Sequence, residues 1–193
     1  MLKSLLLCGV GGQGTVLASR ILAQAAMEDG RFARTAETIG MAQRGGCVVS
    51  HVRIDSEDCA SLIPHGKADI LIAFEPGEAV RNLIFLKPDG IVIVCDNPMC
   101  PVTASLAGIE YDSKKMIDYI KSKVSRVIVV DGNSICEECG SPKVVNVALV
   151  GTIIKTGAAG ISLEAVKKVL KDKLKPELLD MNLKALELGM NCE

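Results

Sequence analysis

The stretch "LLLCGVGGQGTVLASRILAQAA", residues 5–26, constrains the fold of this chain more than any other. An apolar run leads into a group of glycines and then into a segment with helical periodicity, which predicts a buried strand, a tight turn and a helix. Gly9, Gly11 and Gly14 fit the G-x-G-x-x-G spacing of dinucleotide-binding folds. In those folds the glycines let the backbone approach a pyrophosphate, which binds at the N-terminus of the helix.

Two interpretations of this turn compete. The first is an NAD(P)-dependent oxidoreductase, because Glu37 lies at about the distance from the glycines at which an acid at the end of the second strand binds the ribose. The second is that the glycines serve only the geometry of the chain. The spacing by itself does not separate the two, so the rest of the sequence has to decide.

Short β-branched runs alternate with amphipathic segments in the first part of the chain, and after residue 141 the pattern is wholly helical. This pattern predicts an α/β fold that is Rossmann-like, with a mostly parallel sheet flanked by helices, since parallel strands need crossover connections. We expect a single domain over residues 1–193, with a sheet region at 1–132 and C-terminal helices at 141–193 packed on the same domain. The strands are expected at residues 4–9, 32–37, 47–54, 69–74, 90–96 and 126–132.

The composition excludes several classes of function. Lys and Arg number 22 against 23 Asp and Glu, so no basic surplus is available for nucleic-acid binding. No apolar run reaches the roughly 18 residues of a membrane span, and we expect a cytoplasmic protein that binds neither membrane nor nucleic acid. Hydrophobic residues make up 49% but aromatic residues only 3%. This surplus of aliphatic side chains suggests a surface that a partner covers.

The eight cysteines are interpreted as reduced thiols, because Cys8 and Cys95 lie in aliphatic runs and no secretion signal precedes them. Only Cys136 and Cys139, in "CEECG", have the spacing of metal ligands. No second pair completes the four ligands that a zinc or iron–sulfur site needs, so we predict no metal site. An added metal or redox role for this pair is the alternative.

A second glycine loop, "TIGMAQRGGCVVSHVRI", follows directly after Glu37. A dinucleotide-binding fold needs no such loop at that position. Its polar residues Gln43 and Arg44 offer hydrogen-bond donors, and the planar guanidinium of Arg44 can pair with two oxygens of a phosphate or carboxylate. Two glycine loops near the first strands predict one composite edge, directed at a phosphorylated ligand or at another subunit.

Taken together, the two loops resemble the gamma-type subunits of 2-oxoacid:ferredoxin oxidoreductases, the pyruvate/ketoisovalerate oxidoreductase gamma family, and most closely the beta subunits of the indolepyruvate enzymes. The similarity continues through "ADILIAFEPGEAVRNL", "GIVIVCDNPMCP", "KVVNVALVG" and "NLKALELG", whereas "CEECG" departs from it. The resemblance implies a subunit of an enzyme that oxidatively decarboxylates a 2-oxo acid, passes electrons to ferredoxin and forms an acyl-CoA.

The resemblance also implies a division of labour. Thiamine diphosphate, Mg and [4Fe-4S] clusters belong to one or more larger partner subunits, and this chain has no catalytic residue, no tightly bound cofactor and no activity alone. Its expected role is to contact coenzyme A and to close the active site of the larger subunit. In isolation it is expected to self-associate, and a non-catalytic interaction subunit of another complex is a further alternative. The expected contact residues are Gly9, Gly11, Gly12, Gln13, Gly14, Gln43, Arg44, Gly45 and Gly46.

Overall fold

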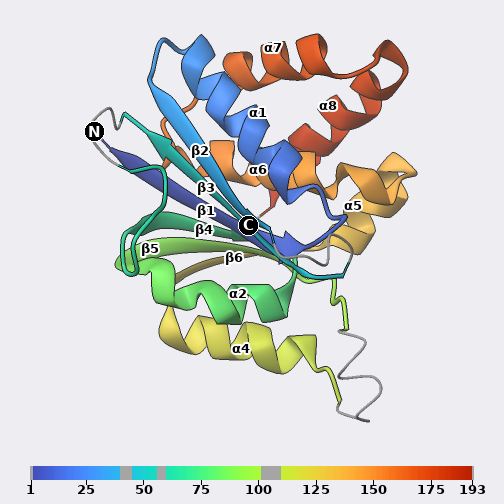
Figure 1. Ribbon diagram of the computed structural model, residues 1–193. Helices are drawn as coiled ribbons and strands as arrows, with labels where there is room; N and C mark the ends of the chain where they lie inside the picture. The colour runs from blue at the N-terminus through green and yellow to red at the C-terminus, as the bar shows by residue number, and fades with distance from the viewer. Residues whose placement is uncertain (1, 40–44, 56–59, 101–109, 193) are drawn as a thin grey trace.

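The computed structural model describes residues 2–39, 45–55, 60–100 and 110–192, which form a six-stranded sheet between two layers of helices (Figure 1). The strands are β1 (Lys3–Val10), β2 (Ala33–Ile39), β3 (Cys47–Ile54), β4 (Ala68–Ala73), β5 (Leu86–Cys95) and β6 (Arg126–Val130). The α-helices are α1 (Thr15–Glu28), α2 (Pro76–Asn82), α4 (Ser113–Lys123), α5 (Gly132–Cys139), α6 (Val145–Thr156), α7 (Leu163–Lys173) and α8 (Pro176–Asn191). Short 3-10 helices are η1 (Leu83–Phe85) and η2 (Pro142–Val144).

The strand order is β2-β3-β1-β4-β5-β6. The pairs β1–β4, β4–β5 and β5–β6 are parallel, whereas β3 is antiparallel to both of its neighbours, β1 and β2. Five of the described strands therefore run in one direction, which confirms the predicted α/β fold with a mostly parallel sheet. All six predicted strands are present, with ends shifted by a few residues.

The connections that follow the neighbouring strands β1 and β4 leave the sheet on opposite faces. After β1 the chain continues into α1 above the sheet, and after β4 it continues into α2 below the sheet (Figure 1). Neighbouring parallel strands with connections on opposite faces leave a crevice at their carboxyl ends, and ligands of open α/β sheets bind there. The glycine turn lies at this switch point, because it directly follows β1.

Strand β1 is buried on both faces, as expected for a central strand of a parallel sheet. Leu5 and Leu7 belong to the hydrophobic cluster on the α1 side of the sheet, and Leu6 and Cys8 to the cluster on the α2 side. The first cluster also contains side chains of all three C-terminal helices, for example Leu149 of α6. The helices after residue 141 thus bury their apolar faces against the same core as α1 and the sheet.

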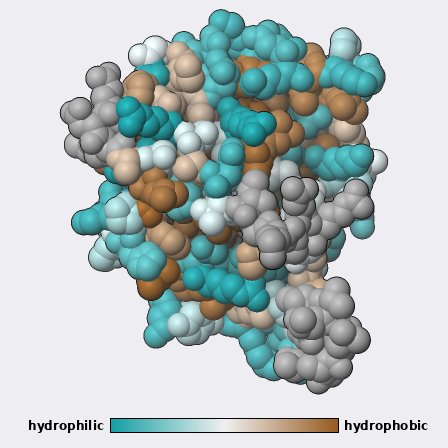
Figure 2. Space-filling model, in the orientation of Figure 1, coloured by the Kyte–Doolittle hydropathy of each residue, from teal (hydrophilic) through white to brown (hydrophobic). Residues whose placement is uncertain are grey.

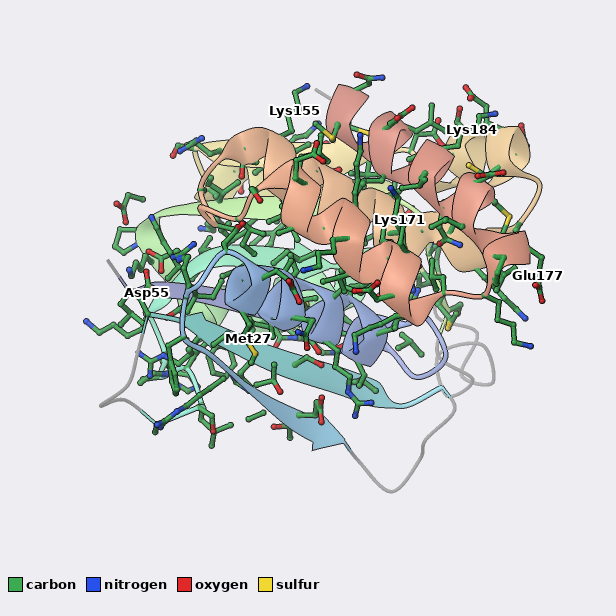
Figure 3. All side chains as sticks on the ribbon, turned by 90° about the horizontal axis from the view of Figure 1, so that it is seen from above. Met27, Asp55, Lys155, Lys171, Glu177 and Lys184 are labelled. Carbon is green, nitrogen blue, oxygen red and sulfur yellow. The ribbon has the colours of Figure 1, made fainter. Side chains whose placement is uncertain are left out.

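Helices α6 and α8 pack backbone to backbone. A Cβ atom on Gly151 would overlap the carbonyl oxygen of Leu186, and one on Gly189 would overlap that of Ala148. The hydroxyl of Thr152 donates to the carbonyl oxygen of Gly189 at 2.9 Å. Seen from above, charged side chains such as Lys171 lie on the outer side of this helical layer (Figure 3).

The surface shown in Figure 2 is mainly hydrophilic, with hydrophobic residues in separate groups. No helix in the described part of the chain combines the length and the apolar character needed to cross a membrane. Exposed large hydrophobic side chains within the described residues are Leu17, Met27, Phe32, Leu62, Ile84, Met99, Tyr119 and Leu178.

Candidate ligand-binding site

The glycine turn between β1 and α1 has a backbone that requires glycine at two positions. Gly12 has a φ of 108° and Gly14 a φ of 87°, which are both disfavoured for residues with a Cβ atom. Among the described residues, a Cβ atom on Gly12 would meet nothing within 4 Å, whereas one on Gly14 would lie 2.7 Å from Nδ2 of Asn146. The turn is therefore open to the outside at Gly12 and packed against α6 at Gly14.

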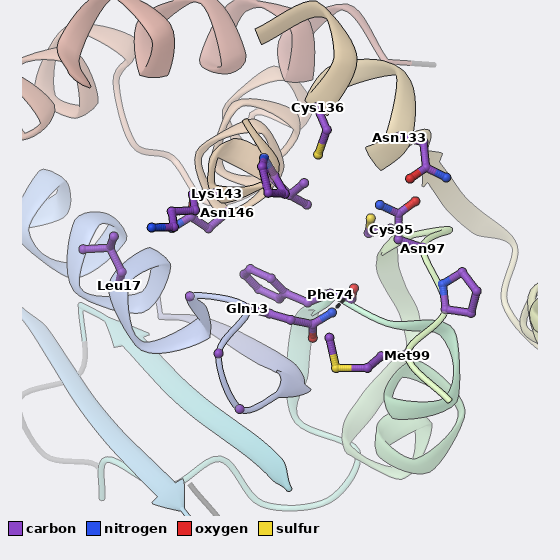
Figure 4. A pocket seen from close by; sticks show the side chains of 16 residues that line it. Gln13, Leu17, Phe74, Cys95, Asn97, Met99, Asn133, Cys136, Lys143 and Asn146 are labelled. Carbon is purple, nitrogen blue, oxygen red and sulfur yellow. Dashed lines mark hydrogen bonds between the residues drawn. The ribbon is translucent and has the colours of Figure 1, made fainter. Parts of the chain in front are cut away.

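The side chain of Gln13 closes this turn from within. Its Oε1 accepts from the backbone N–H of Val10 at 2.7 Å, and its Nε2 donates to the carbonyl oxygen of Phe74 at 3.1 Å (Figure 4). The backbone N–H of Gln13 donates to the carbonyl oxygen of Val10 at 3.1 Å. Gln13 thus joins the turn to the end of β4, and its donors are engaged within the protein.

The second glycine loop contacts the first through the backbone. The N–H of Gly11 donates to the carbonyl oxygen of Gly46 at 2.8 Å, and the N–H of Gly45 donates to that of Gly11 at 3.4 Å. The predicted composite edge therefore has a direct physical basis in these two bonds. Gln43 and Arg44, which we expect at its tip, lie outside the described residues.

The backbone donors that the turn can offer to a ligand are fewer than the sequence suggested. The N–H groups of Gly11 and Gln13 are already paired, so within the described residues Gly12, Gly14 and the first turn of α1 are the open donors. The N-terminus of α1 has no side-chain cap and no acidic residue in its first turn. Its unpaired N–H groups and the positive end of the helix dipole therefore favour an anion.

A cavity of about 700 Å³ opens beside this helix end, at the carboxyl ends of β1, β4 and β5 (Figure 4). Amide side chains and one Lys form its polar part, and none of the lining residues in the described part of the chain is acidic. The Oδ1 atom of Asn97 is buried there and has no partner among the described residues. The cavity is lined by Gly11, Gly12, Gln13, Gly14, Leu17, Phe74, Cys95, Asn97, Pro98, Met99, Asn133, Cys136, Pro142, Lys143, Val145 and Asn146.

A smaller cavity of about 480 Å³ lies on the other side of the glycine turn, against the start of β3. Thr15, the first residue of α1, contributes to its wall, and its hydroxyl oxygen is buried without a partner among the described residues. The turn is thus accessible from two sides. It shares Gly11, Gly12 and Gly14 between the two cavities.

The position of Glu37 contradicts the geometry that a nicotinamide-binding site would need. Its strand, β2, is not adjacent to β1, because β3 is inserted between them. The Glu37 carboxylate instead lies 3.7 Å from the guanidinium of Arg20. An acid that binds the ribose must lie on the strand next to the glycine turn, so Glu37 cannot serve in that role here.

The two cysteines of "CEECG" point to different surroundings. Cys136 lines the large cavity, whereas Cys139 packs against the hydrophobic cluster beneath the C-terminal helices. Burial raises the pKa of both thiols. No group of three or more His, Cys, Asp or Glu in the described residues has the geometry to hold a metal ion.

Sequence reasoning missed most of the cavity wall opposite the glycine turn. Asn97 follows β5, and Lys143 and Asn146 belong to η2 and α6, all far from the glycines in the sequence. A usable signal existed for Asn97, because polar residues that follow parallel strands gather at the same edge of a sheet. No local pattern marked Lys143 or Asn146.

The next strand-to-helix corner, between β4 and α2, is built from buried carboxylates. Glu75 caps α2 by accepting from the N–H of Glu78 at 2.9 Å, and it also accepts from the hydroxyl of Tyr111. The carboxylate of Glu78 accepts from the thiol of Cys47 at 3.1 Å and pairs with Arg81. Burial and the Glu75 carboxylate raise the pKa of Tyr111, and the Glu78 carboxylate raises that of Cys47.

The mostly parallel sheet with helices on both faces and a glycine turn at its switch point places the chain in the class of open α/β domains. The sequence specifies the group more closely: the chain belongs to the pyruvate ferredoxin/flavodoxin oxidoreductase family, whose sequence profile matches residues 4–192. It is thus a subunit of a 2-oxoacid:ferredoxin oxidoreductase.

Individual relatives agree with this assignment. Indolepyruvate oxidoreductase subunit IorB of Archaeoglobus fulgidus is 38% identical over 192 residues, which covers 99% of this chain and 95% of the relative. The common gamma subunit of pyruvate/ketoisovalerate oxidoreductases of Pyrococcus abyssi is 29% identical and covers 92% of this chain and 89% of the relative. The fold is similar to that in 2-oxoglutarate:ferredoxin oxidoreductase of Magnetococcus marinus, solved with 2-oxoglutarate, coenzyme A and succinyl-CoA bound. That similarity has a TM-score of 0.74 and 22% identity, and it covers 97% of this chain and 30% of the other.

Proposed function

We propose that this subunit binds coenzyme A in the large cavity and holds it toward the active centre of a larger partner subunit, in an enzyme of the indolepyruvate type. The observation that carries the proposal is the cavity itself, which joins an uncapped helix N-terminus to a wall of amide side chains at the switch point of the sheet. The indolepyruvate specificity rests on the relatives from archaea, and the coenzyme on the Magnetococcus marinus enzyme.

The chemistry of the cavity matches that of coenzyme A in two respects. Its phosphates are anionic, and the N–H groups of α1 together with the Lys143 ammonium supply positive charge, with no carboxylate among the described lining residues. Its pantetheine arm contains two amides, which suit amide side chains such as Asn97, whose Oδ1 has no donor among the described residues. A volume of about 700 Å³ also lies within the usual range of about 300–1,000 Å³ for small-molecule sites.

The rim of the cavity supports the proposed partner. Leu17 and Met99 are 39% and 41% exposed although both line the cavity. Apolar side chains at the edge of a ligand site are suited to contact another subunit, which then covers the ligand and excludes water. In this proposal the partner supplies thiamine diphosphate, Mg and the [4Fe-4S] clusters that pass electrons to ferredoxin. The subunit contributes by positioning, because holding a thiol in line with a bound intermediate lowers the barrier without a covalent step.

The proposal is tested with Lys143→Ala in the enzyme reconstituted with its partner. Removing this ammonium should raise the KM for coenzyme A about tenfold, the equivalent of about 1.4 kcal/mol, while turnover at saturating coenzyme A stays near the wild-type value. Lys171→Ala is the matched control, since Lys171 lies on the outer side of α7 away from the cavity. An unchanged KM in the assembled Lys143 variant contradicts the proposed site.

A further inference from the structure

We propose that Cys136 is a modification site, at which its thiol forms a mixed disulfide with coenzyme A supplied as the disulfide of coenzyme A. The adduct occupies the large cavity and blocks it reversibly. This inference rests on the proposed function, since the cavity must first bind the coenzyme. It gives a role to the "CEECG" segment, which the family resemblance left unexplained.

The position of Cys136 carries the proposal. The side chain projects from α5 into the cavity, opposite the glycine turn that follows β1 (Figure 4). Cys95, at the end of β5, also belongs to the cavity wall, but it is fully buried. Cys136 is only half-buried, so a ligand in the cavity can reach its sulfur. Asn97, whose Oδ1 has no partner among the described residues, lines the same cavity, and its side-chain amide is of the type that pairs with the amides of a pantetheine arm.

The reaction is a thiol–disulfide exchange and needs no further oxidant. The Cys136 thiol loses its proton, and the thiolate attacks one sulfur of the coenzyme A disulfide. A new S–S bond forms to the protein while the original S–S bond breaks. The second coenzyme A leaves as a thiolate and takes up a proton. Cys136 is thereby oxidised and one coenzyme A is reduced, and excess thiol reverses the step.

Selectivity comes from binding and not from an activated thiol. Burial raises the pKa of Cys136, so its thiolate is scarce at neutral pH. The rate of disulfide exchange at Cys136 therefore depends on the local concentration of the coenzyme A disulfide that the cavity holds beside the thiol. Cys139 is the matched comparison: it lies on the same helix, its pKa is also raised by burial, and it is outside the cavity wall.

The experiment treats the reconstituted enzyme with coenzyme A disulfide and then separates the subunits under non-reducing, denaturing conditions for mass spectrometry. Wild type and Cys139→Ser should gain one coenzyme A on this chain, and dithiothreitol should remove it. Cys136→Ser and Cys136→Ala should gain none. Because the cavity raises the local concentration of the reagent, glutathione disulfide should react at least about tenfold more slowly. Desulfo-coenzyme A, which lacks the thiol, should slow the labelling.

Two results overturn the inference: labelling of Cys136→Ser as fast as wild type, or equal rates with the two disulfides. The proposed function is separated by measuring the binding of desulfo-coenzyme A to the wild-type enzyme by calorimetry. If desulfo-coenzyme A binds and Cys136 gains no adduct, the modification site is wrong and the proposed function stands. If it does not bind, both are wrong.

Discussion

Two neighbouring strand-to-helix corners of this molecule differ in how the N-terminus of the helix is capped. At both corners a parallel strand ends and a helix begins, at the carboxyl edge of the sheet. The corner between β1 and α1 is made of glycines and leaves the helix uncapped. The corner between β4 and α2 is closed by the Glu75 side chain, and a second buried carboxylate, Glu78, lies in the first turn of the helix.

The difference shows which helix end is available to a ligand. A helix N-terminus attracts anions only while its N–H groups and its positive dipole end are not already neutralised. At α2 these are satisfied by carboxylates that also bind Tyr111 and Cys47, so this corner holds adjoining segments in place. At α1 these N–H groups have no partner among the described residues, and the helix end borders two cavities. Adjacent corners thus differ: carboxylates close the one between β4 and α2, whereas the one between β1 and α1 has no such cap.

The largest loss of stability is expected when the closed corner between β4 and α2 is disrupted. Glu75→Ala removes the cap of α2 and the acceptor of the Tyr111 hydroxyl, which should lower the free energy of unfolding by about 2–4 kcal/mol. Urea denaturation measures this change. Glu75→Gln, which retains an acceptor oxygen, should lose less than half as much. Equal losses in the two variants would contradict this expectation, because they would show that one acceptor oxygen at this position does not close the corner.

A smaller effect is expected from giving the open corner the acidic character of the closed one. Leu17→Glu places a carboxylate in the first turn of α1, at an exposed position on the cavity rim. The helix should gain up to about 0.5 kcal/mol of stability from the dipole, while an anionic ligand should bind about fivefold more weakly. Leu17→Gln controls for the lost leucine. If the Glu and Gln variants have the same KM for coenzyme A, the N-terminus of α1 binds no anion.

The smallest effect is the loss of stability at alkaline pH that comes from Tyr111 at the closed corner. The pKa of Tyr111 is raised in the folded protein from its ordinary value of 10.0, first by burial and then by its bond to Glu75. Above pH 10 the unfolded chain therefore loses this proton before the folded chain does, so stability falls as pH rises. Tyr111→Phe should be less stable at neutral pH but should lose less between pH 10 and 11. Parallel thermal melts at both pH values compare the two proteins, and identical alkaline losses would contradict the assignment.

The elements of the fold were predictable because their signals are local. The run from Leu5 to Cys8 and the glycines after it marked β1 and the turn. The order of the strands was not predicted, since pairing is a long-range property. One signal was available: seven residues separate β2 from β3, which is too short for a parallel crossover and requires antiparallel pairing.

The candidate site was predictable on one side only. The glycine turn and its contact with the second loop follow from sequence spacing, but the side chain of Gln13 turns inward, where it accepts from the N–H of Val10 and donates to the carbonyl oxygen of Phe74. Short-range spacing cannot show whether a polar side chain serves the ligand or the turn. The opposite wall contains Cys136 and Lys143, which follow β6 in the chain. Their place beside the crevice depends on the position of β6 in the sheet, which is a long-range property.

The glycine contact between α6 and α8 has a mechanical consequence. Because the two backbones touch at Gly151 and Gly189, neither helix can slide along the other without a clash. The N-terminal end of α6 forms part of the cavity wall through Val145 and Asn146. Helices α6 and α8 are therefore expected to move as one unit, so a side chain introduced at Gly189 of α8 should also displace the part of the cavity wall that α6 forms.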